Sequence, residues 1–174
     1  KLMASSVNGD GRDRRDRRTP RQLPADVGAF VGRGPDLDGL DRLGGEPGGR
    51  PVVAVICGAA GVGKTALALR WAHRARDRFP DGQLYLDLRG YGTGTPLSAT
   101  DALGHLCVAL GRSEADLPAD AAERAALFRT ESAGRRLLIV LDNAASADQI
   151  RPLLPGSGPS VVLVTSRDHL GGLV

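Results

Sequence analysis

Short apolar runs alternate with longer amphipathic stretches along most of this chain. Three runs are continuous and rich in β-branched side chains, at residues 52–57, 137–141 and 161–164, and the segment 83–88 contains a shorter apolar run. Continuous apolar runs of this length predict strands that are buried on both faces of a parallel sheet. Residues 64–79 instead place apolar side chains three and four positions apart, which predicts an amphipathic helix.

Further helices are expected between the strands. Ser98 and Ser146 each precede a helical pattern in the position of an N-terminal cap, and another helix is expected over residues 119–133. Strands that alternate with helices in this way form an open parallel sheet with helices on both faces, joined by right-handed crossovers. The predicted fold class is therefore α/β, in three α/β/α layers.

Composition restricts the class of protein. Hydrophobic residues make up 41% and charged residues 25% of the 174 residues, values that are typical of globular proteins. The longest apolar run is far shorter than the about 18 residues that cross a membrane. Cys57 and Cys107 are too few to form a disulfide framework, so we expect a cytoplasmic protein with no membrane contact.

Charge is unevenly distributed along the chain. Of the 23 basic and 20 acidic residues, seven and three fall within residues 1–24, so residues 25–174 carry 16 and 17. The Arg-rich start has linker composition, and it is either a solvated flexible linker or a segment in weak contact with nucleic acid or a partner. The remainder lacks the basic face of a domain that binds a phosphate backbone, so we expect no direct nucleic-acid binding by it.

A glycine-rich turn follows the first predicted strand. Residues 58–65 read GAAGVGKT, a full match to the phosphate-binding pattern G-x-x-x-x-G-K-[ST]. Glycines in such a turn let backbone N–H groups point at phosphate oxygens, at the positive end of the next helix. Lys64 would reach the β- and γ-phosphates, and the Thr65 hydroxyl would bind Mg²⁺. The expected ligand is ATP or ADP with Mg²⁺, bound by Gly58, Ala59, Ala60, Gly61, Val62, Gly63, Lys64, Thr65 and Ala66.

Two charged residues that follow other strands complete the candidate site. Asp142 is the candidate second Mg²⁺ ligand, with a turn or helix cap as the alternative. Arg167 would contact the γ-phosphate, or else be solvated at the surface. The candidate catalytic residues are thus Lys64, Asp142 and Arg167, and the metal ligands are Thr65 and Asp142. Asn143 stands where many ATP-hydrolysing proteins have a second acidic residue, and an amide accepts no proton, so ATP hydrolysis to ADP is expected to be slow or absent.

These segments together resemble the NB-ARC domain, a P-loop ATPase of the signal-transduction (STAND) class. The resemblance covers about residues 22–174. Within the family, the sequence is most similar to the domains of actinobacterial antibiotic-regulatory transcription factors of the SARP type. It rests on GAAGVGKT, on FPDGQLYLDLRGY at 79–91, LLIVLDNA at 137–144, QIRPLLPG at 149–156 and VVLVTSR at 161–167. The chain is thus divided into a linker, residues 1–24, and an NB-ARC nucleotide-binding domain, residues 25–174.

The resemblance implies a P-loop NTPase fold and a role as an ATP/ADP-dependent switch in transcription regulation and signal transduction. In that fold the strand before Arg167 lies between the P-loop strand and the strand that carries Asp142. The parent protein would contain an upstream DNA-binding region and downstream winged-helix and helical-repeat regions. FVGR at residues 30–33 resembles the segment that packs on the adenine ring. The candidate adenine-side residues, through backbone contacts, are Val31, Gly32 and Arg33.

The resemblance also implies that the domain is incomplete at its C-terminus, because the family's later subdomains would follow Val174. The sheet edge beside the P-loop strand would then lack its last strand. We expect weaker nucleotide retention than in a full-length protein, and self-association through that edge.

Two rival classes remain open. A P-loop kinase-type metabolic enzyme would need a lid over its phosphate acceptor and a base, and neither is evident in the sequence. An AAA-type DNA-associated ATPase would be expected to have a basic folded face, and residues 25–174 have a net charge of −1.

Overall fold

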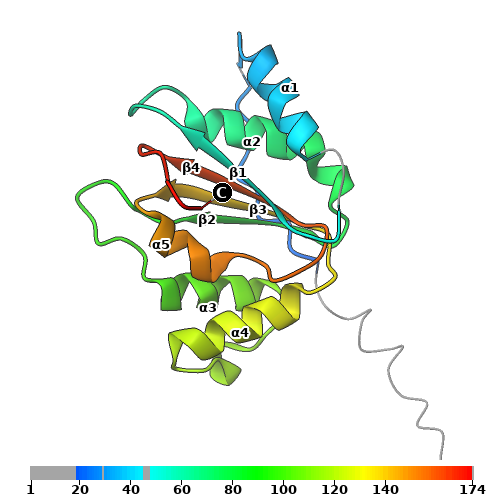
Figure 1. Ribbon diagram of the computed structural model, residues 1–174, viewed down its shortest axis with the longest axis vertical. Helices are drawn as coiled ribbons and strands as arrows, with labels where there is room; N and C mark the ends of the chain where they lie inside the picture. Colours follow the sequence, from blue (N-terminus) through cyan, green and yellow to red (C-terminus); the bar gives the residue numbers. More distant parts are fainter. Residues whose placement is uncertain (1–18, 29, 45–47, 174) are drawn as a thin grey trace, which may run out of the picture.

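One four-stranded parallel sheet forms the centre of the molecule. The computed structural model describes residues 19–28, 30–44 and 48–173. Its strands are β1 (Val52–Cys57), β2 (Gly82–Asp87), β3 (Leu137–Ala144) and β4 (Val161–Ser166). They lie in the order β1-β4-β3-β2, so β4 separates the P-loop strand from the strand that carries Asp142 (Figure 1). The predicted open parallel sheet is confirmed, as is the strand order that the resemblance implies.

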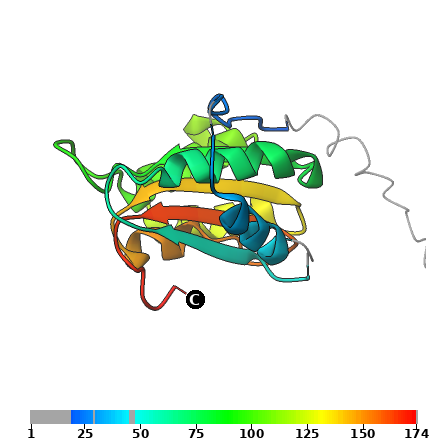
Figure 2. The same cartoon turned by 90° about the horizontal axis from the view of Figure 1, so that it is seen from above.

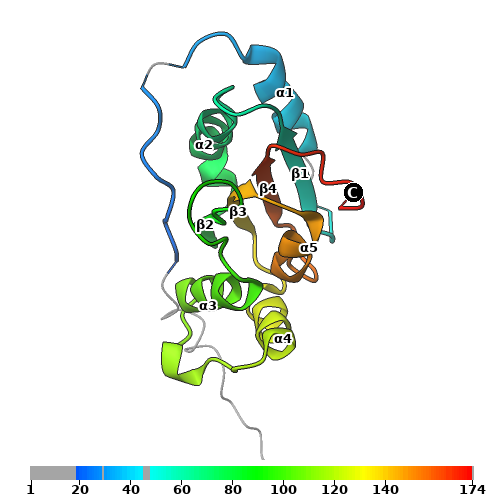
Figure 3. The same cartoon turned by 90° about the vertical axis from the view of Figure 1, so that its left-hand side faces the viewer.

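Helices cover both faces of this sheet. Helices α1 (Gly34–Leu43) and α2 (Lys64–Ala75) lie on one face, and α3 (Ala99–Ala109), α4 (Ala121–Ser132) and α5 (Ala147–Ile150) on the other (Figure 1 and, from the side, Figure 3). Short 3-10 turns are η1 (Arg76–Arg78), η2 (Glu114–Asp116) and η3 (Arg151–Leu153). The predicted α/β/α layers are confirmed. In the part of the chain that the structure describes, no helix combines the length and the apolar character needed to cross a membrane.

The strand β3 shows how one apolar run builds two cores. Leu138 and Val140 are buried in the cluster that contains Trp71 of α2. Ile139 and Leu141 are buried in the cluster beneath α3, α4 and α5. Since successive strand residues point to opposite faces, a run without polar interruptions closes both faces of the sheet.

Three helices begin at side-chain caps. The Ser98 hydroxyl accepts a hydrogen bond from the backbone N–H of Asp101, and the Ser146 hydroxyl accepts one from the N–H of Gln149. Asp120 caps α4 in the same manner. Both helix starts expected from serine residues are therefore confirmed.

The hydrophobic pattern predicts no helix over residues 34–43, where the structure has α1. Its sequence, GPDLDGLDRL, contains few strong helix formers. The helix is held by packing instead: Leu40 joins the core cluster of α2, and Trp71 Nε1 donates a hydrogen bond to Asp41 Oδ1 at 3.0 Å. Tertiary contacts therefore override a weak local preference. Pro35 and Asp36 in the first turn were the available signal of a helix start.

The segment before α1 packs along the side of the domain. Residues 19–28, called here the N-terminal strap, run past the outer edge of β2 and across α2 toward α1 (Figure 2 and Figure 3). Arg21 forms a parallel bridge with Gln83 of β2. Asp26 forms a 2.6 Å ion pair with Arg70 of α2. Folded contacts thus begin at the strap, within the expected linker 1–24, whereas residues 1–18 lie outside the described residues.

Candidate nucleotide-binding site

The glycine-rich turn leads from the carboxyl end of β1 directly into α2. Gly61 and Gly63 have φ values of +77° and +82°, a left-handed conformation that favours glycine. Gly63 is also the N-cap of α2, and no side chain caps that helix start. The turn and the positive end of a helix thus meet as they do in phosphate-binding sites.

A cavity of about 440 Å³ opens beside this turn, at the carboxyl edge of the sheet. It is lined by Ala60, Gly61, Gly63, Lys64, Thr65, Ala66, Asp142, Asn143, Thr165, Ser166 and Arg167. The strand register explains the convergence, because Cys57 pairs with Ser166 and Asp87 pairs with Asp142. The structure therefore brings the candidate catalytic residues Lys64, Asp142 and Arg167 to one cavity, together with Thr65.

The Lys64 ammonium is held over the loop. Its Nζ donates hydrogen bonds to the carbonyl oxygens of Gly58 and Ala59, each at 2.7 Å. An ammonium has three N–H donors, so these two bonds leave one for a phosphate oxygen. The two carbonyls fix a positive charge on the wall of the cavity, where an anionic phosphate chain would bind.

Asp142 is the acidic centre of the cavity. Its side chain is almost wholly buried, and three hydroxyl groups donate to its carboxylate. Thr65 Oγ1 donates to Oδ1 at 2.8 Å, Tyr85 Oη donates to Oδ2 at 2.9 Å, and Thr165 Oγ1 donates to Oδ1. Burial raises the pKa of Tyr85, and the charge and hydrogen bond of Asp142 raise it further. Tyr85 therefore stays a protonated donor at neutral pH.

The contact between Thr65 and Asp142 fits a Mg²⁺ site. A hydroxyl and a carboxylate in direct contact are oxygen donors that one small cation can bind together, while phosphate and water supply its other ligands. Over the residues described, no group of three His, Cys, Asp or Glu side chains forms a metal site made of protein alone. The two predicted ligands therefore suit a metal that arrives with a phosphate chain.

Asn143 lies at an irregular point of β3. It has a φ of +63°, at the place where the register between β3 and β4 shifts. Its N–H donates to Thr165 Oγ1 at 2.9 Å, and its Nδ2 lies 3.5 Å from the Tyr91 carbonyl oxygen. Asparagine tolerates the left-handed conformation better than most residues. The position beside the carboxylate of Asp142 thus holds an amide.

None of the three adenine-side candidates is in the lining of this cavity. Val31 is 90% exposed, and Gly32 has a φ of +90°. Arg33 Nη2 donates to the Val62 carbonyl oxygen at 2.5 Å. This bond ties the start of α1 to the phosphate loop. Contact of Val31, Gly32 and Arg33 with adenine stays a prediction.

Three residues that shape the site were not expected from the sequence. Tyr85 and Thr165 bind the Asp142 carboxylate, and Tyr91 lies beneath Arg167, with 4.7 Å from the guanidinium carbon to the ring centre. Polar positions inside otherwise apolar strands were the available signal for the first two. Tyr91 lies in a loop, where hydrophobic positions follow neither the helical nor the strand periodicity.

Gly90 allows that loop to approach β3. Its N–H donates to the Asn143 carbonyl oxygen at 2.8 Å, and a Cβ at Gly90 would collide with that same oxygen and with the Ala145 nitrogen. We expect Gly90→Ala to lower the free energy of unfolding by about 1–3 kcal/mol, because the backbone must shift. Urea denaturation measures this change. Gly92→Ala, in the same loop with open space around it but a φ of +139°, controls for backbone strain alone. Equal losses in the two variants would contradict the proposed collision.

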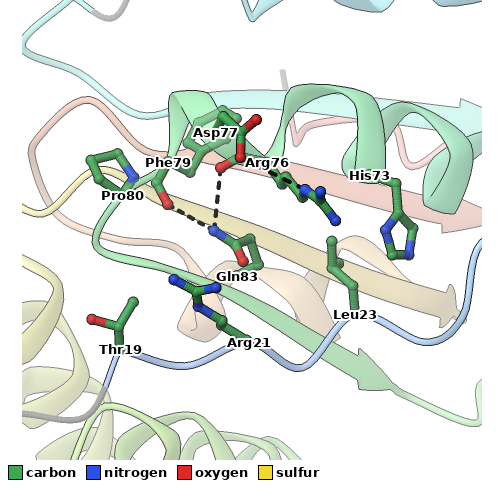
Figure 4. A pocket seen from close by; sticks show the side chains of 9 residues that line it. All are labelled: Thr19, Arg21, Leu23, His73, Arg76, Asp77, Phe79, Pro80 and Gln83. Carbon is green, nitrogen blue, oxygen red and sulfur yellow. Dashed lines mark hydrogen bonds and ion pairs between the residues drawn. The ribbon is translucent and has the colours of Figure 1, made fainter.

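A larger cavity of about 530 Å³ lies elsewhere, between the N-terminal strap and the end of α2 that is remote from the loop (Figure 4). Arg21 and Leu23 of the strap face His73 of α2 and Arg76 of η1 across it (Figure 4). It has neither the glycine-rich turn nor the buried carboxylate. The smaller cavity is the better candidate because the chemistry for a phosphate chain and a hard cation converges there.

Comparisons with known proteins identify a family and two similar regulatory proteins. The model of the AAA ATPase domain family matches residues 29–164. The regulatory protein AfsR of Streptomyces coelicolor is 47% identical over 154 residues, and that of Streptomyces griseus is 49% identical over 149 residues. Each alignment covers 85% of this chain but only 15% of the relative, so the chain spans a small part of the length of these regulators. The chain belongs to the AAA ATPase domain family.

Proposed function

We propose that this domain is an ATP/ADP-binding regulatory switch of the NB-ARC (STAND) type within a cytoplasmic transcription regulator, and that it hydrolyses ATP slowly or not at all. The observation that carries the proposal is the convergence of Lys64, Thr65, Asp142 and Arg167 on one cavity that also holds Asn143. The similarity to regulatory proteins supports a regulatory use of that site. The parent protein would supply the DNA-binding and helical-repeat regions.

Each group has a distinct task in the proposed switch. The loop amides and Lys64 bind the phosphates, and Thr65 and Asp142 bind Mg²⁺. The metal, when bound, neutralises charge on the phosphate chain. Arg167 contacts the γ-phosphate, so the domain distinguishes ATP from ADP by one charged hydrogen-bonding group. Asn143 accepts no proton, which makes the triphosphate state long-lived.

The open sheet edge supports the expected self-association. In the described ranges, β1 has a partner strand, β4, on one side only. A strand edge with unpaired N–H and C=O groups pairs readily with another strand. We propose that a second copy, or a later segment of the parent protein, pairs there.

An AAA-type DNA-associated ATPase is the second candidate, because the matching family model is of the AAA type. The charge distribution argues against it, since residues 25–174 carry 16 basic and 17 acidic residues. No observation favours the kinase-type alternative. The switch therefore accounts best for the site.

ATP turnover separates these functions. We expect the protein to hydrolyse ATP at about 10⁻³ to 10⁻¹ per second, because loss of a general base costs about 10²- to 10⁴-fold from a typical rate of about 10 per second. Turnover is measured with ATP alone, with small-molecule phosphate acceptors and with duplex DNA. Low turnover in all three supports the switch. Stimulation by acceptors would indicate a kinase, and stimulation by DNA would indicate the DNA-associated ATPase.

A further inference from the structure

Arg167 has an unusual environment for a guanidinium at the edge of a cavity. It follows β4, and its side chain is exposed. Throughout residues 19–28, 30–44 and 48–173 it forms no ion pair with a carboxylate. Its recorded contact is the face of the Tyr91 ring, 4.7 Å from the guanidinium carbon to the ring centre. A flexible, exposed arginine is thus placed by an aromatic ring and keeps its charge unneutralised.

The ring is itself fixed at both ends. The Tyr91 hydroxyl donates to Asp168 Oδ2 at 2.8 Å and lies 3.3 Å from Ser166 Oγ. The backbone of its loop is tied to β3 through the bond from the Gly90 N–H to the Asn143 carbonyl oxygen. The ring is therefore bonded to the same edge of the sheet that carries Asp142.

The neighbouring carboxylate does not neutralise Arg167 in the structure. Asp168 is the next residue in the chain, and its carboxylate is the nearest candidate to neutralise the guanidinium by sequence. In the structure this carboxylate accepts a hydrogen bond from Tyr91 and forms no ion pair with Arg167. A guanidinium whose charge is not paired attracts a phosphate more strongly.

We propose that Tyr91 is a positioning residue for Arg167: its ring holds the guanidinium toward the cavity, and this sets how strongly the domain prefers ATP over ADP. The inference rests on the proposed function, because it concerns the residue through which Arg167 would recognise the γ-phosphate. Tyr91 acts through Arg167 and is not in the cavity lining. It makes loop 88–97 a determinant of nucleotide selectivity.

A double-mutant cycle with calorimetric titration of ATP and ADP tests this proposal. The quantity of interest is the ratio of the two affinities. Tyr91→Leu removes the ring, and a cation–π contact at an exposed site contributes about 0.5–1 kcal/mol, so we expect the preference for ATP to fall about 2- to 5-fold. Arg167→Ala removes the guanidinium, and we expect it to lower the preference for ATP about 10-fold or more. In the Arg167→Ala background, Tyr91→Leu is expected to change nothing further.

Tyr91→Phe is the matched conservative variant. It keeps the ring and removes the hydroxyl bond to Asp168, so we expect the ATP preference to stay within about 2-fold of the original protein. If Tyr91→Phe loses as much preference as Tyr91→Leu, the hydroxyl and not the ring is responsible, and the proposal fails. It also fails if Tyr91→Leu weakens ATP and ADP equally, since the residue would then be structural only.

The same titrations separate a failure of this inference from a failure of the proposed function. If the unmodified protein binds neither nucleotide, the proposed function is wrong and the inference falls with it. If it binds both, and Arg167→Ala changes the ratio while Tyr91→Leu does not, only the role of Tyr91 is wrong. Thermal unfolding of each variant, compared with the unmodified protein, shows that the loop change leaves the domain folded.

Discussion

Replacing Lys64 by alanine is expected to weaken ATP binding about 100-fold. Charge-assisted hydrogen bonds contribute about 1.5–3 kcal/mol, and the ammonium would contact the phosphates of a bound nucleotide directly. Lys64 is also the only lysine after residue 1, so no neighbouring ammonium can replace it. Calorimetric titration with Mg-ATP measures the loss. Lys64→Arg is expected to recover little of it, because a forked guanidinium differs in shape from a compact ammonium.

Arg74→Ala is the matched control for this experiment. Arg74 lies on the same helix, is 56% exposed and pairs with Asp41 of α1 at 2.9 Å, away from the cavity. Its removal is expected to leave ATP affinity within about 2-fold, since exposed ion pairs contribute little. If the Lys64→Ala variant is folded by circular dichroism and binds ATP as tightly as the unmodified protein, the proposed nucleotide-binding site is wrong.

Replacing Asp142 by asparagine is expected to abolish most of the effect of Mg²⁺ on ATP binding. The carboxylate would bind the metal, whereas an amide carries no charge and presents N–H groups to the hydroxyls of Thr65, Thr165 and Tyr85. We expect the ratio of ATP affinities with and without Mg²⁺ to fall about 10-fold or more. Titrations at fixed ionic strength, with Mg²⁺ or with a chelator, measure this ratio.

Asp87→Asn is the control for the charge change. Asp87 is the register partner of Asp142 on β2, but it is exposed and accepts a hydrogen bond from the Arg89 N–H at 2.9 Å. Its replacement is expected to leave the Mg²⁺ effect intact. A Mg²⁺ effect that survives in Asp142→Asn would mean that the metal is bound by other groups, and the assignment of Asp142 as a ligand would be wrong.

The sheet and the phosphate loop were predictable because their signals are local. The run 137–141 has no polar residue, and a strand covered on both faces buries it completely. The spacing of glycine, lysine and threonine in GAAGVGKT identifies a phosphate-binding turn. The parallel sheet then brings the residues at the ends of β3 and β4 to the same edge as this turn. The meeting of Asp142 and Arg167 at the loop thus follows from topology.

The remaining features depend on contacts between segments that are distant in sequence. Helix α1 is held by Trp71, about 30 positions further along, and its own sequence favours a helix only weakly. The bridge between Arg21 and Gln83 uses backbone groups, which carry no side-chain signal. The stacking of Arg167 on Tyr91 depends on how the loop after β2 folds back. No periodic pattern in the sequence encodes these pairings.

The N-terminal strap determines where the chain enters the domain. It crosses the outer edge of β2, whereas the last described residues lie beside β1, at the opposite edge (Figure 2 and Figure 3). Four strands about 4.8 Å apart separate these edges by about 15 Å. Regions joined before and after the domain in a longer protein would consequently be held at opposite edges of the sheet.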